Sequence, residues 1–219
     1  MKQVQRPQVE VVREDWQLTL QGETVLVCQL TYPRWDGRSR GVRAMNRYYQ
    51  RVAETWKRRW NRELYLQACL DLAGHSGTGH PFQPWQAQVE TFVTLERGPL
   101  VSLWQEGRER PGRQVPFVVR RGDTWNVETG APVMLSSFFG GERGWRKRVV
   151  NQLTQQAQKR LERGDSLLFQ TCATLTKTQF DPTRFWVEED GLRIFYPPEI
   201  LGSRVEGTVT FPVGISEKE

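Results

Sequence analysis

The sequence predicts an α+β fold, in which an antiparallel β-sheet is packed by two main helices at about residues 40–73 and 142–163. Two long segments carry apolar residues at three- and four-residue steps, which is typical of amphipathic helices. Shorter segments alternate apolar and polar residues, as half-buried strands do. Glycine and proline fall between these segments, so short turns can connect the strands.

The first predicted elements form a strand hairpin. Residues 16–20 (WQLTL) alternate apolar and polar side chains, QGET predicts a turn, and VLVCQLTYP predicts a return strand that ends at Pro33. The loop RWDGRS follows. In this loop Ser39 is placed to cap the next helix, because its hydroxyl can accept a hydrogen bond from a free backbone N–H.

The helix predicted over residues 40–73 has two distinct faces. Its apolar face consists of Met45, Tyr49, Val52, Trp56 and Trp60. At about 100° per residue, an opposite row of arginines is formed by Arg43, Arg47, Arg51, Arg58 and Arg62. We interpret this row as a solvated outer face. A docking stripe for an anionic partner is the alternative, although Glu54 interrupts the row.

The stretch GHSGTGHPFQPW (74–85) is rich in glycine and proline and predicts a boundary. We expect an N-terminal lobe of residues 1–84, with the strand hairpin and the long helix, and a C-terminal lobe of residues 85–219. We expect the two to pack as one globular unit. Cys69, Asp71, His75 and His80 could in principle ligate a metal, but their spacing matches no zinc pattern, so no metal site is predicted.

The second half alternates strand and helix signals. Strands are predicted within residues 87–98, 99–110 and 114–135, and again near 185–187, 192–196 and 207–212. The helix predicted over residues 142–163 is ended by Gly164. It repeats apolar residues every four positions, at Trp145, Val149, Leu153, Ala157 and Leu161.

Three consecutive carboxylates, Glu188, Glu189 and Asp190, precede Gly191 between two apolar runs. Asp-Gly is a strong hairpin signal, because glycine readily adopts a positive φ. We therefore interpret the carboxylates as the polar tip of a hairpin. The sequence carries no phosphate-binding loop, dinucleotide fingerprint or zinc-protease motif. We predict no catalytic residue and no cofactor.

Composition bounds the partner and the compartment. The 219 residues carry a net charge of +6, with 25 acidic residues interspersed among 31 basic ones. The aromatics near the arginines share the helix's apolar face, so nucleic-acid binding is not expected. The chain shows neither an export signal nor an apolar run that could span a membrane, which predicts a soluble, cytoplasmic protein. The alternative is an extracytoplasmic ectodomain, if the chain is a trimmed piece of a longer protein.

The last hairpin carries a family resemblance. FWVEEDGLRIFYPPEILGSRVEGTVTFPVGI (185–215) contains an apolar strand, an acidic-glycine turn, a second strand, a proline-containing tip and a closing strand. The match continues upstream in LVSLWQEG, WNVETGAPVMLSSFFGGERGWRKRVVNQL and LTYPRWDGRSRGVRAMNRYYQ. Over about residues 25–215 the chain resembles the RsiV-like family. This family comprises the lysozyme-sensing ectodomain of an anti-sigma factor and related non-catalytic domains of PdaC-type peptidoglycan deacetylases.

The resemblance implies a bacterial, non-enzymatic binding domain of sensor type. Its expected partner is a lysozyme-like, wall-active protein or another component of the cell envelope. Because rigid sheets commonly present their contacts on loops, we expect the ligand to bind at Pro197, Pro198, Glu199, Ser203, Arg204 and Glu206.

Two other function classes stay open. A hydrolase-type enzyme would require Glu188, Asp190 and His80 to converge in one pocket. A module that binds nucleic acid or another polyanion would use the arginine row from Arg43 to Arg62.

Overall fold

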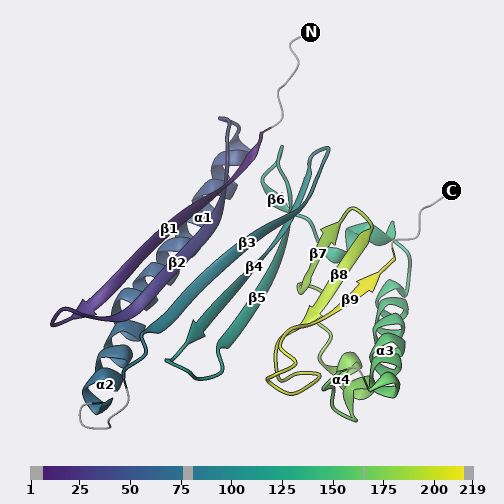
Figure 1. Ribbon diagram of the computed structural model, residues 1–219. Coiled ribbons are helices and arrows are strands. Elements are labelled where there is room, and N and C mark those ends of the chain that lie inside the picture. Colours follow the sequence, from purple (N-terminus) through teal and green to yellow (C-terminus); the bar gives the residue numbers. More distant parts are fainter. Residues whose placement is uncertain (1–6, 76–80, 165, 215–219) are drawn as a thin grey trace. The chain divides into compact units, whose positions relative to one another are not determined.

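The computed structural model describes residues 7–75, 81–164 and 166–214 and confirms the α+β class (Figure 1). It divides into two compact units. The first comprises residues 7–75, 81–91, 106–117 and 127–130, and the second comprises 92–105, 118–126, 131–164 and 166–214. The separate lobes expected at residues 1–84 and 85–219 stay a prediction.

The first unit begins with the predicted hairpin, whose strands are longer than their sequence patterns suggested. Strand β1 (Val9–Leu20) pairs with the antiparallel β2 (Glu23–Trp35). The turn between them places Gln21 at φ 53° and Gly22 at φ 88°. A left-handed turn of this kind matches the twist of the two strands, which explains the short QGET connection.

The prediction that β2 ends at Pro33 is wrong. Pro33 lies inside β2, opposite Val11 of β1, and the strand continues to Trp35. Strand β3 pairs with β2 only over Leu26–Leu30, before the proline is reached. A proline is tolerated beyond that pairing, because its missing N–H removes no hydrogen bond between β2 and β3.

The long predicted helix is one helical path with an irregular turn. It consists of α1 (Arg40–Arg59), a π-helical turn η1 (Trp60–Leu64) and α2 (Tyr65–His75). The predicted cap is confirmed, since the Ser39 hydroxyl accepts a hydrogen bond from the Val42 N–H at 3.0 Å. The buried residues on this path are Gly41, Val42, Met45, Tyr49, Ala53, Trp60, Leu64 and Ala68.

The single predicted sheet is in fact two sheets. The first has the order β1-β2-β3-β4-β5-β6, with β3 (Trp85–Arg97), β4 (Leu100–Arg110), β5 (Phe117–Asn126) and β6 (Ala131–Pro132). Its β2–β3 pair is parallel. A parallel pair needs a long crossover, and the helical path between β2 and β3 provides it.

The second sheet lies in the second unit and has the order β7-β8-β9, formed by β7 (Phe185–Glu188), β8 (Gly191–Tyr196) and β9 (Val209–Val213). Hydrogen bonds tie β7 to the first sheet: the Val187 N–H donates to Ser102 Oγ at 2.8 Å, and the Thr94 hydroxyl donates to the Val187 carbonyl at 2.6 Å. Gly122 of β5 is required here, because a Cβ at that position would lie 2.0 Å from the Phe185 carbonyl oxygen.

Three helical elements complete the second unit, namely η2 (Leu135–Phe139), α3 (Trp145–Arg163) and α4 (Cys172–Thr178). The predicted apolar row of α3 is confirmed, with Val149, Leu153 and Ala157 buried in the core. Gly164 ends the helix at φ 67°, as expected. The helix starts three residues later than the predicted residue 142, after Gly144 at φ 86°.

All three cysteines are free thiols. Cys28 and Cys172 are buried, as the composition predicts, whereas Cys69 is only half-buried. Burial raises the pKa of the Cys28 thiol to about 12, so this thiol stays protonated and unreactive at neutral pH.

Candidate functional site

The acidic tip is a two-residue hairpin turn, which confirms the sequence interpretation. Glu188 pairs with Gly191 across β7 and β8, so Glu189 and Asp190 form the turn. Gly191 has φ 144°, and a Cβ there would lie 3.1 Å from the Val213 carbonyl oxygen. The glycine is therefore required by both its conformation and the approach of β9.

Two of the three carboxylates of the tip, Glu188 and Asp190, share one arginine. Arg193 lies 2.9 Å from Glu188 and 2.7 Å from Asp190. Glu188 also accepts a hydrogen bond from Trp186 Nε1 at 2.8 Å. The hydrogen bond from Arg193 lowers the pKa of Asp190 below its ordinary value, so this group is ionised at neutral pH and is a poor proton donor.

The enzyme alternative needed His80 beside Glu188 and Asp190, and His80 lies outside the described residues. Glu188 and Asp190 themselves share Arg193 and stand at a turn. Within the described ranges, histidine, cysteine, aspartate and glutamate nowhere gather in the groups of three or more that a metal ion needs.

The loop expected to bind a ligand, residues 197–206, is held against the segment that follows α3. The Ser203 N–H donates to the Leu167 carbonyl at 3.1 Å, and the Leu167 N–H donates to the Glu206 carboxylate at 2.6 Å. The Phe169 N–H donates to the Leu201 carbonyl at 2.8 Å. The loop is therefore fixed by backbone hydrogen bonds on both sides of an antiparallel bridge between Leu168 and Gly202.

The packing beneath this loop leaves no room for a larger residue at Gly202. A Cβ there would lie 2.8 Å from the Leu167 carbonyl oxygen. Leu168 and Leu201 are buried in the core of the second unit. In and next to these two segments, three buried hydroxyl groups have no hydrogen-bond partner within the described part of the chain, namely those of Ser166, Ser203 and Thr208.

Apolar side chains are exposed where the two segments meet. Val205 is 75% exposed, Leu167 57% and Phe169 40%. Arg204 stands beside Val205 and is also exposed. We call Leu167, Phe169, Arg204 and Val205 the loop surface. Exposed apolar groups gathered on a rigid loop are typical of contact sites for another molecule.

The predicted loop residues are only partly at this surface. Glu199 is exposed at the tip with φ 66°, whereas Pro197, Pro198, Ser203 and Glu206 are half-buried. Glu206 has a structural role, because its carboxylate holds the Leu167 N–H. Sequence reasoning missed Leu167 and Phe169. The run SLLF (166–169) is apolar, but the sequence alone does not show whether a short apolar run is buried in the core or exposed at the surface.

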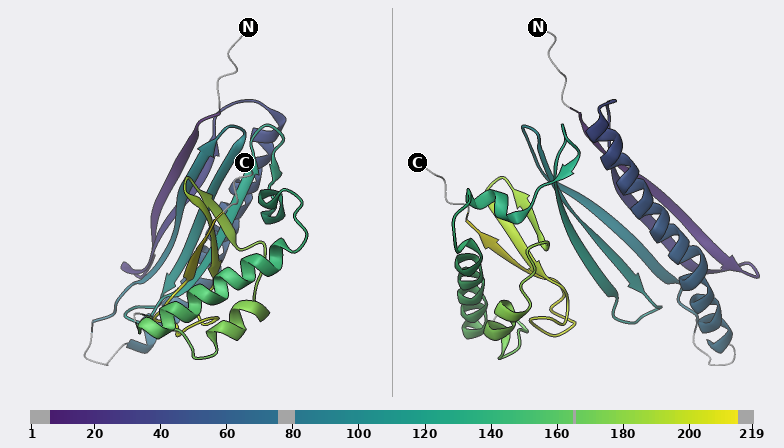
Figure 2. Two further views of the ribbon diagram at one scale, coloured as in Figure 1. Left: turned by 90° about the vertical axis from the view of Figure 1, so that its right-hand side faces the viewer. Right: turned by 180° about the vertical axis from the view of Figure 1, so that it is seen from behind.

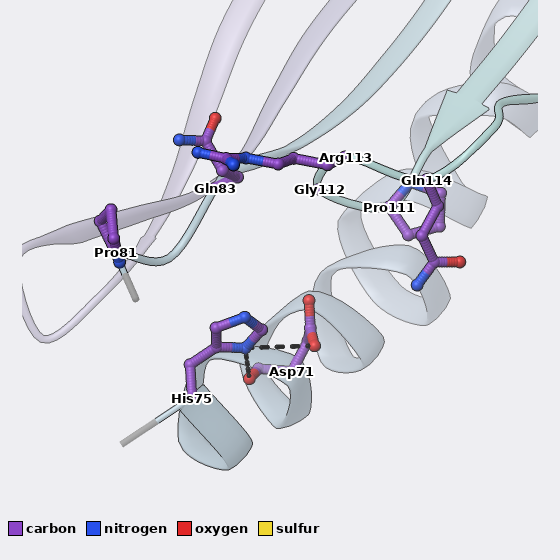
Figure 3. Close-up of a pocket in the computed structure, with 8 residues that line it drawn as sticks. All are labelled: Asp71, His75, Pro81, Gln83, Pro111, Gly112, Arg113 and Gln114. Atoms are coloured by element: carbon purple, nitrogen blue, oxygen red, sulfur yellow. Dashed lines mark hydrogen bonds and ion pairs between the residues drawn. The ribbon is translucent and has the colours of Figure 1, made fainter. Parts of the chain in front are cut away.

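A separate pocket of about 360 Å³ lies in the first unit, beside the end of α2 (Figure 3). His75 Nδ1 lies 3.0 Å from the Asp71 carbonyl oxygen and 3.5 Å from its carboxylate, which also accepts a hydrogen bond from Trp85 Nε1 at 2.8 Å. Arg113 extends toward Gln83 on the other side (Figure 3). The polar groups of the described lining residues can offer hydrogen bonds to a small polar molecule.

The arginine row lies where the sequence placed it. Its five members lie on α1 and η1 and are all exposed: Arg43, Arg47, Arg51, Arg58 and Arg62. Across the residues that the structure covers, no helix combines the length and the apolar character required to cross a membrane.

No protein-family model matches this sequence, and no curated protein matches it either. Solved structures do share the fold. One is a member of the DUF3298 family from Bacteroides fragilis, with a TM-score of 0.69 at 13% identity, covering 95% of this chain and 90% of that one. Another is a DUF3298 family protein from Pseudomonas aeruginosa, with a TM-score of 0.60 at 12% identity, covering 95% of this chain and 91% of that one. At these identities the likeness establishes the fold.

Proposed function

We propose that this chain is a non-enzymatic binding domain of sensor type that uses the loop surface to contact a protein ligand at the cell envelope. The ligand class that we favour is a wall-active enzyme of the lysozyme kind. The observation that carries the proposal is the cluster of exposed apolar side chains on a loop that backbone hydrogen bonds hold in place.

The loop surface has the properties of a protein contact. Val205 and Leu167 leave most of their apolar surface exposed to water. Burying this surface against a partner would contribute about 25 cal/mol of binding free energy per Å². Because the loop is already ordered by the bonds to Leu167 and Phe169, binding does not have to order it first. This saves conformational entropy and favours affinity.

The family resemblance supplies the ligand class. The residues that resemble the RsiV-like family in 185–215 include all of β8, the loop at 197–206 and β9. The similarity of fold to DUF3298 family structures agrees with a domain of this architecture. The net charge of +6 favours a neutral or acidic wall enzyme over a strongly basic one, because like charges slow encounter.

The test is direct binding of the purified chain to a panel of purified muramidases of different net charge, measured by interferometry. The variant Leu167→Ser/Val205→Ser removes the exposed apolar groups. We expect it to weaken binding at least tenfold, equivalent to about 1.4 kcal/mol. The matched control is Leu66→Ser/Leu70→Ser, which removes two equally exposed leucines from α2 in the other unit and should leave the affinity unchanged.

Equal loss in both double variants, or no loss in either, would exclude the loop surface as the contact. A chain that binds none of the muramidases would contradict the ligand class. Turnover of a wall substrate by the chain alone would instead favour the enzyme alternative.

A further inference from the structure

The outward face of the helical path α1–η1–α2 carries a row of exposed arginines and leucines. Arg43, Arg47 and Arg51 follow each other at four-residue steps, two positions away from the buried residues Met45 and Tyr49. Two positions correspond to about 200° around a helix, so the arginines lie on the side opposite the core. Seen from behind in Figure 2, the path runs across the outside of β1 and β2.

The row continues beyond the π-helical turn and changes character there. Arg58, Arg62, Leu66 and Leu70 again follow at four-residue steps, and the buried row alongside them is Trp60, Leu64 and Ala68. A π turn has more residues per turn than an α-helix, so four-residue steps stay aligned through it. Leu66 is 60% exposed and Leu70 65%. Five arginines are thus followed by two exposed leucines on one face.

The arginines of this row are not neutralised by the protein. Within the described part of the chain, the guanidinium groups of Arg43, Arg47, Arg51, Arg58 and Arg62 form no ion pair and no side-chain hydrogen bond. The carboxylate that interrupts the row, Glu54, lies 3.2 Å from Lys57, and Glu63 lies 2.9 Å from Arg59. The nearby acidic groups are therefore balanced by cations that do not belong to the row.

The arginines also enclose space for an anionic group. A surface hollow of about 570 Å³ is lined by Arg47, Arg51 and Arg58, together with Gln50, Glu54 and Thr55. Phosphate is a good ligand for such a setting, because the arginine fork matches its oxygens. From Arg43 to Arg62 the row extends over about 28 Å, since a helix rises 1.5 Å per residue.

We propose that this helix face binds the surface of an anionic phospholipid bilayer, with the arginines on headgroup phosphates and Leu66 and Leu70 in the interfacial region. The charge alone would also suit a nucleic acid. Leu66 and Leu70 favour the bilayer over the nucleic acid. A bilayer interface binds both basic and apolar groups on one helix face, whereas the phosphate backbone of a nucleic acid offers no apolar surface to the leucines. Attachment of this kind is peripheral and requires no membrane-spanning helix.

The test is co-sedimentation of the full chain with vesicles of phosphatidylglycerol and phosphatidylcholine, compared with phosphatidylcholine alone. We expect binding to the anionic vesicles only, and weaker binding as salt rises, because exposed charges are screened. The variant Arg47→Gln/Arg51→Gln/Arg58→Gln should reduce the partition coefficient at least thirtyfold. Leu66→Ser/Leu70→Ser should reduce it at least fivefold.

The matched control is Arg97→Gln/Arg143→Gln/Arg163→Gln, which removes three exposed arginines from the second unit and the same net charge. It should retain most of the parent's binding, and circular dichroism should show all variants folded. If the control lost as much vesicle binding as the Arg47→Gln/Arg51→Gln/Arg58→Gln variant, the proposal would be contradicted, because net charge alone would then explain binding. Retention on immobilised nucleic acid without vesicle binding, or a leucine variant that binds vesicles as the parent does, would also overturn it.

Discussion

Helices α1 and α3 are both rich in arginine, but their exposed arginines differ. At the end of α1, Arg59 pairs with the buried Glu109 at 2.7 Å, whereas the arginine row on the outer face of α1 forms no ion pair or side-chain hydrogen bond with a described residue. Arginines of α3 reach other elements of the second unit. Arg160 donates to the Thr210 carbonyl at 2.8 Å and lies 4.8 Å from the centre of the Phe211 ring. Arg148 pairs with Glu142 at 2.9 Å, and Arg146 lies 5.3 Å from the Phe180 ring. On α1, by contrast, the arginines of the row have no such partner among the described residues.

The difference shows that basic composition does not identify a binding surface. Around α3, other elements place carbonyl groups, a carboxylate and aromatic rings within reach of Arg146, Arg148 and Arg160, so these three guanidinium groups are partly satisfied inside their own unit. The outward face of α1 lies on the side away from β2 and is exposed along its whole length. Only unsatisfied cations are available to an outside partner, so the partners of each arginine, and not the number of arginines, separate the two helices.

The largest expected effect tests what orients the row on α1. Trp60 is fully buried in the core of the first unit, contacts the rings of Trp16 and Trp56, and donates from Nε1 to Glu109 at 3.0 Å. Trp60→Ala should lower the free energy of unfolding by about 3–5 kcal/mol, because it opens a cavity and leaves a buried carboxylate with one donor fewer. Chemical denaturation monitored by circular dichroism measures this loss.

Trp60→Phe is the control for that prediction, since it keeps an aromatic ring and removes only the indole N–H. It should lose less than half as much stability as the alanine variant. Equal losses in both would mean that the hydrogen bond to Glu109, and not the packing, fixes the helix at the π turn.

The next effect compares the two helices directly. Arg160→Gln in α3 should cost about 1–2 kcal/mol, because it removes a charge-assisted hydrogen bond to Thr210 and a cation–π contact with Phe211. Arg51→Gln in α1 should change stability by less than about 0.5 kcal/mol, as surface substitutions without partners do. Urea denaturation of the two variants measures both. A cost at Arg51 as large as that at Arg160 would contradict the distinction between satisfied and unsatisfied arginines.

Much of this architecture could be predicted from the sequence where one local signal dominates. The Ser39 cap, the Glu189–Asp190 turn before Gly191 and the four-residue rows of both helices follow from short-range patterns. The division into two sheets and the parallel β2–β3 pair could not, because strand partners are set by contacts distant in sequence. Helix α4 was missed because threonines reduce its helix propensity; the bond from the Tyr196 hydroxyl to the Thr176 carbonyl at 2.7 Å helps to hold it.

For the candidate sites, too, the sequence predicts the features that follow from local patterns and misses those that depend on contacts distant in sequence. The exposure of the arginine row follows from helical periodicity, and the sequence located it correctly. Whether a guanidinium has a partner depends on the surrounding elements, which the sequence did not give. The loop surface was located only in part, because Leu167 and Phe169 join Val205 through a bridge between segments more than thirty residues apart.

The smallest expected effect concerns acid, and it also separates the two helices. Burial, the largest influence on Asp181, raises its pKa, but hydrogen bonds from Thr183 and the charges of Arg184 and of Arg146 on α3 outweigh it, so the pKa lies below the ordinary 3.8. The ionised carboxylate therefore stabilises the fold above the ordinary pKa, and this contribution disappears as the pH falls through the lowered one. Asp181→Asn keeps an oxygen for Thr183 and removes the charge, so it should be less stable than the parent at pH 7, and the difference should shrink as the pH falls through the lowered pKa of Asp181. The acid-unfolding midpoint should move by less than about half a pH unit.

The row on α1 pairs with no described carboxylate, so Arg51→Gln should leave the acid-unfolding midpoint where it is in the parent. Fluorescence-monitored acid titrations of the three proteins test this, and an equal shift in both variants would show that overall charge, not pairing, governs the response.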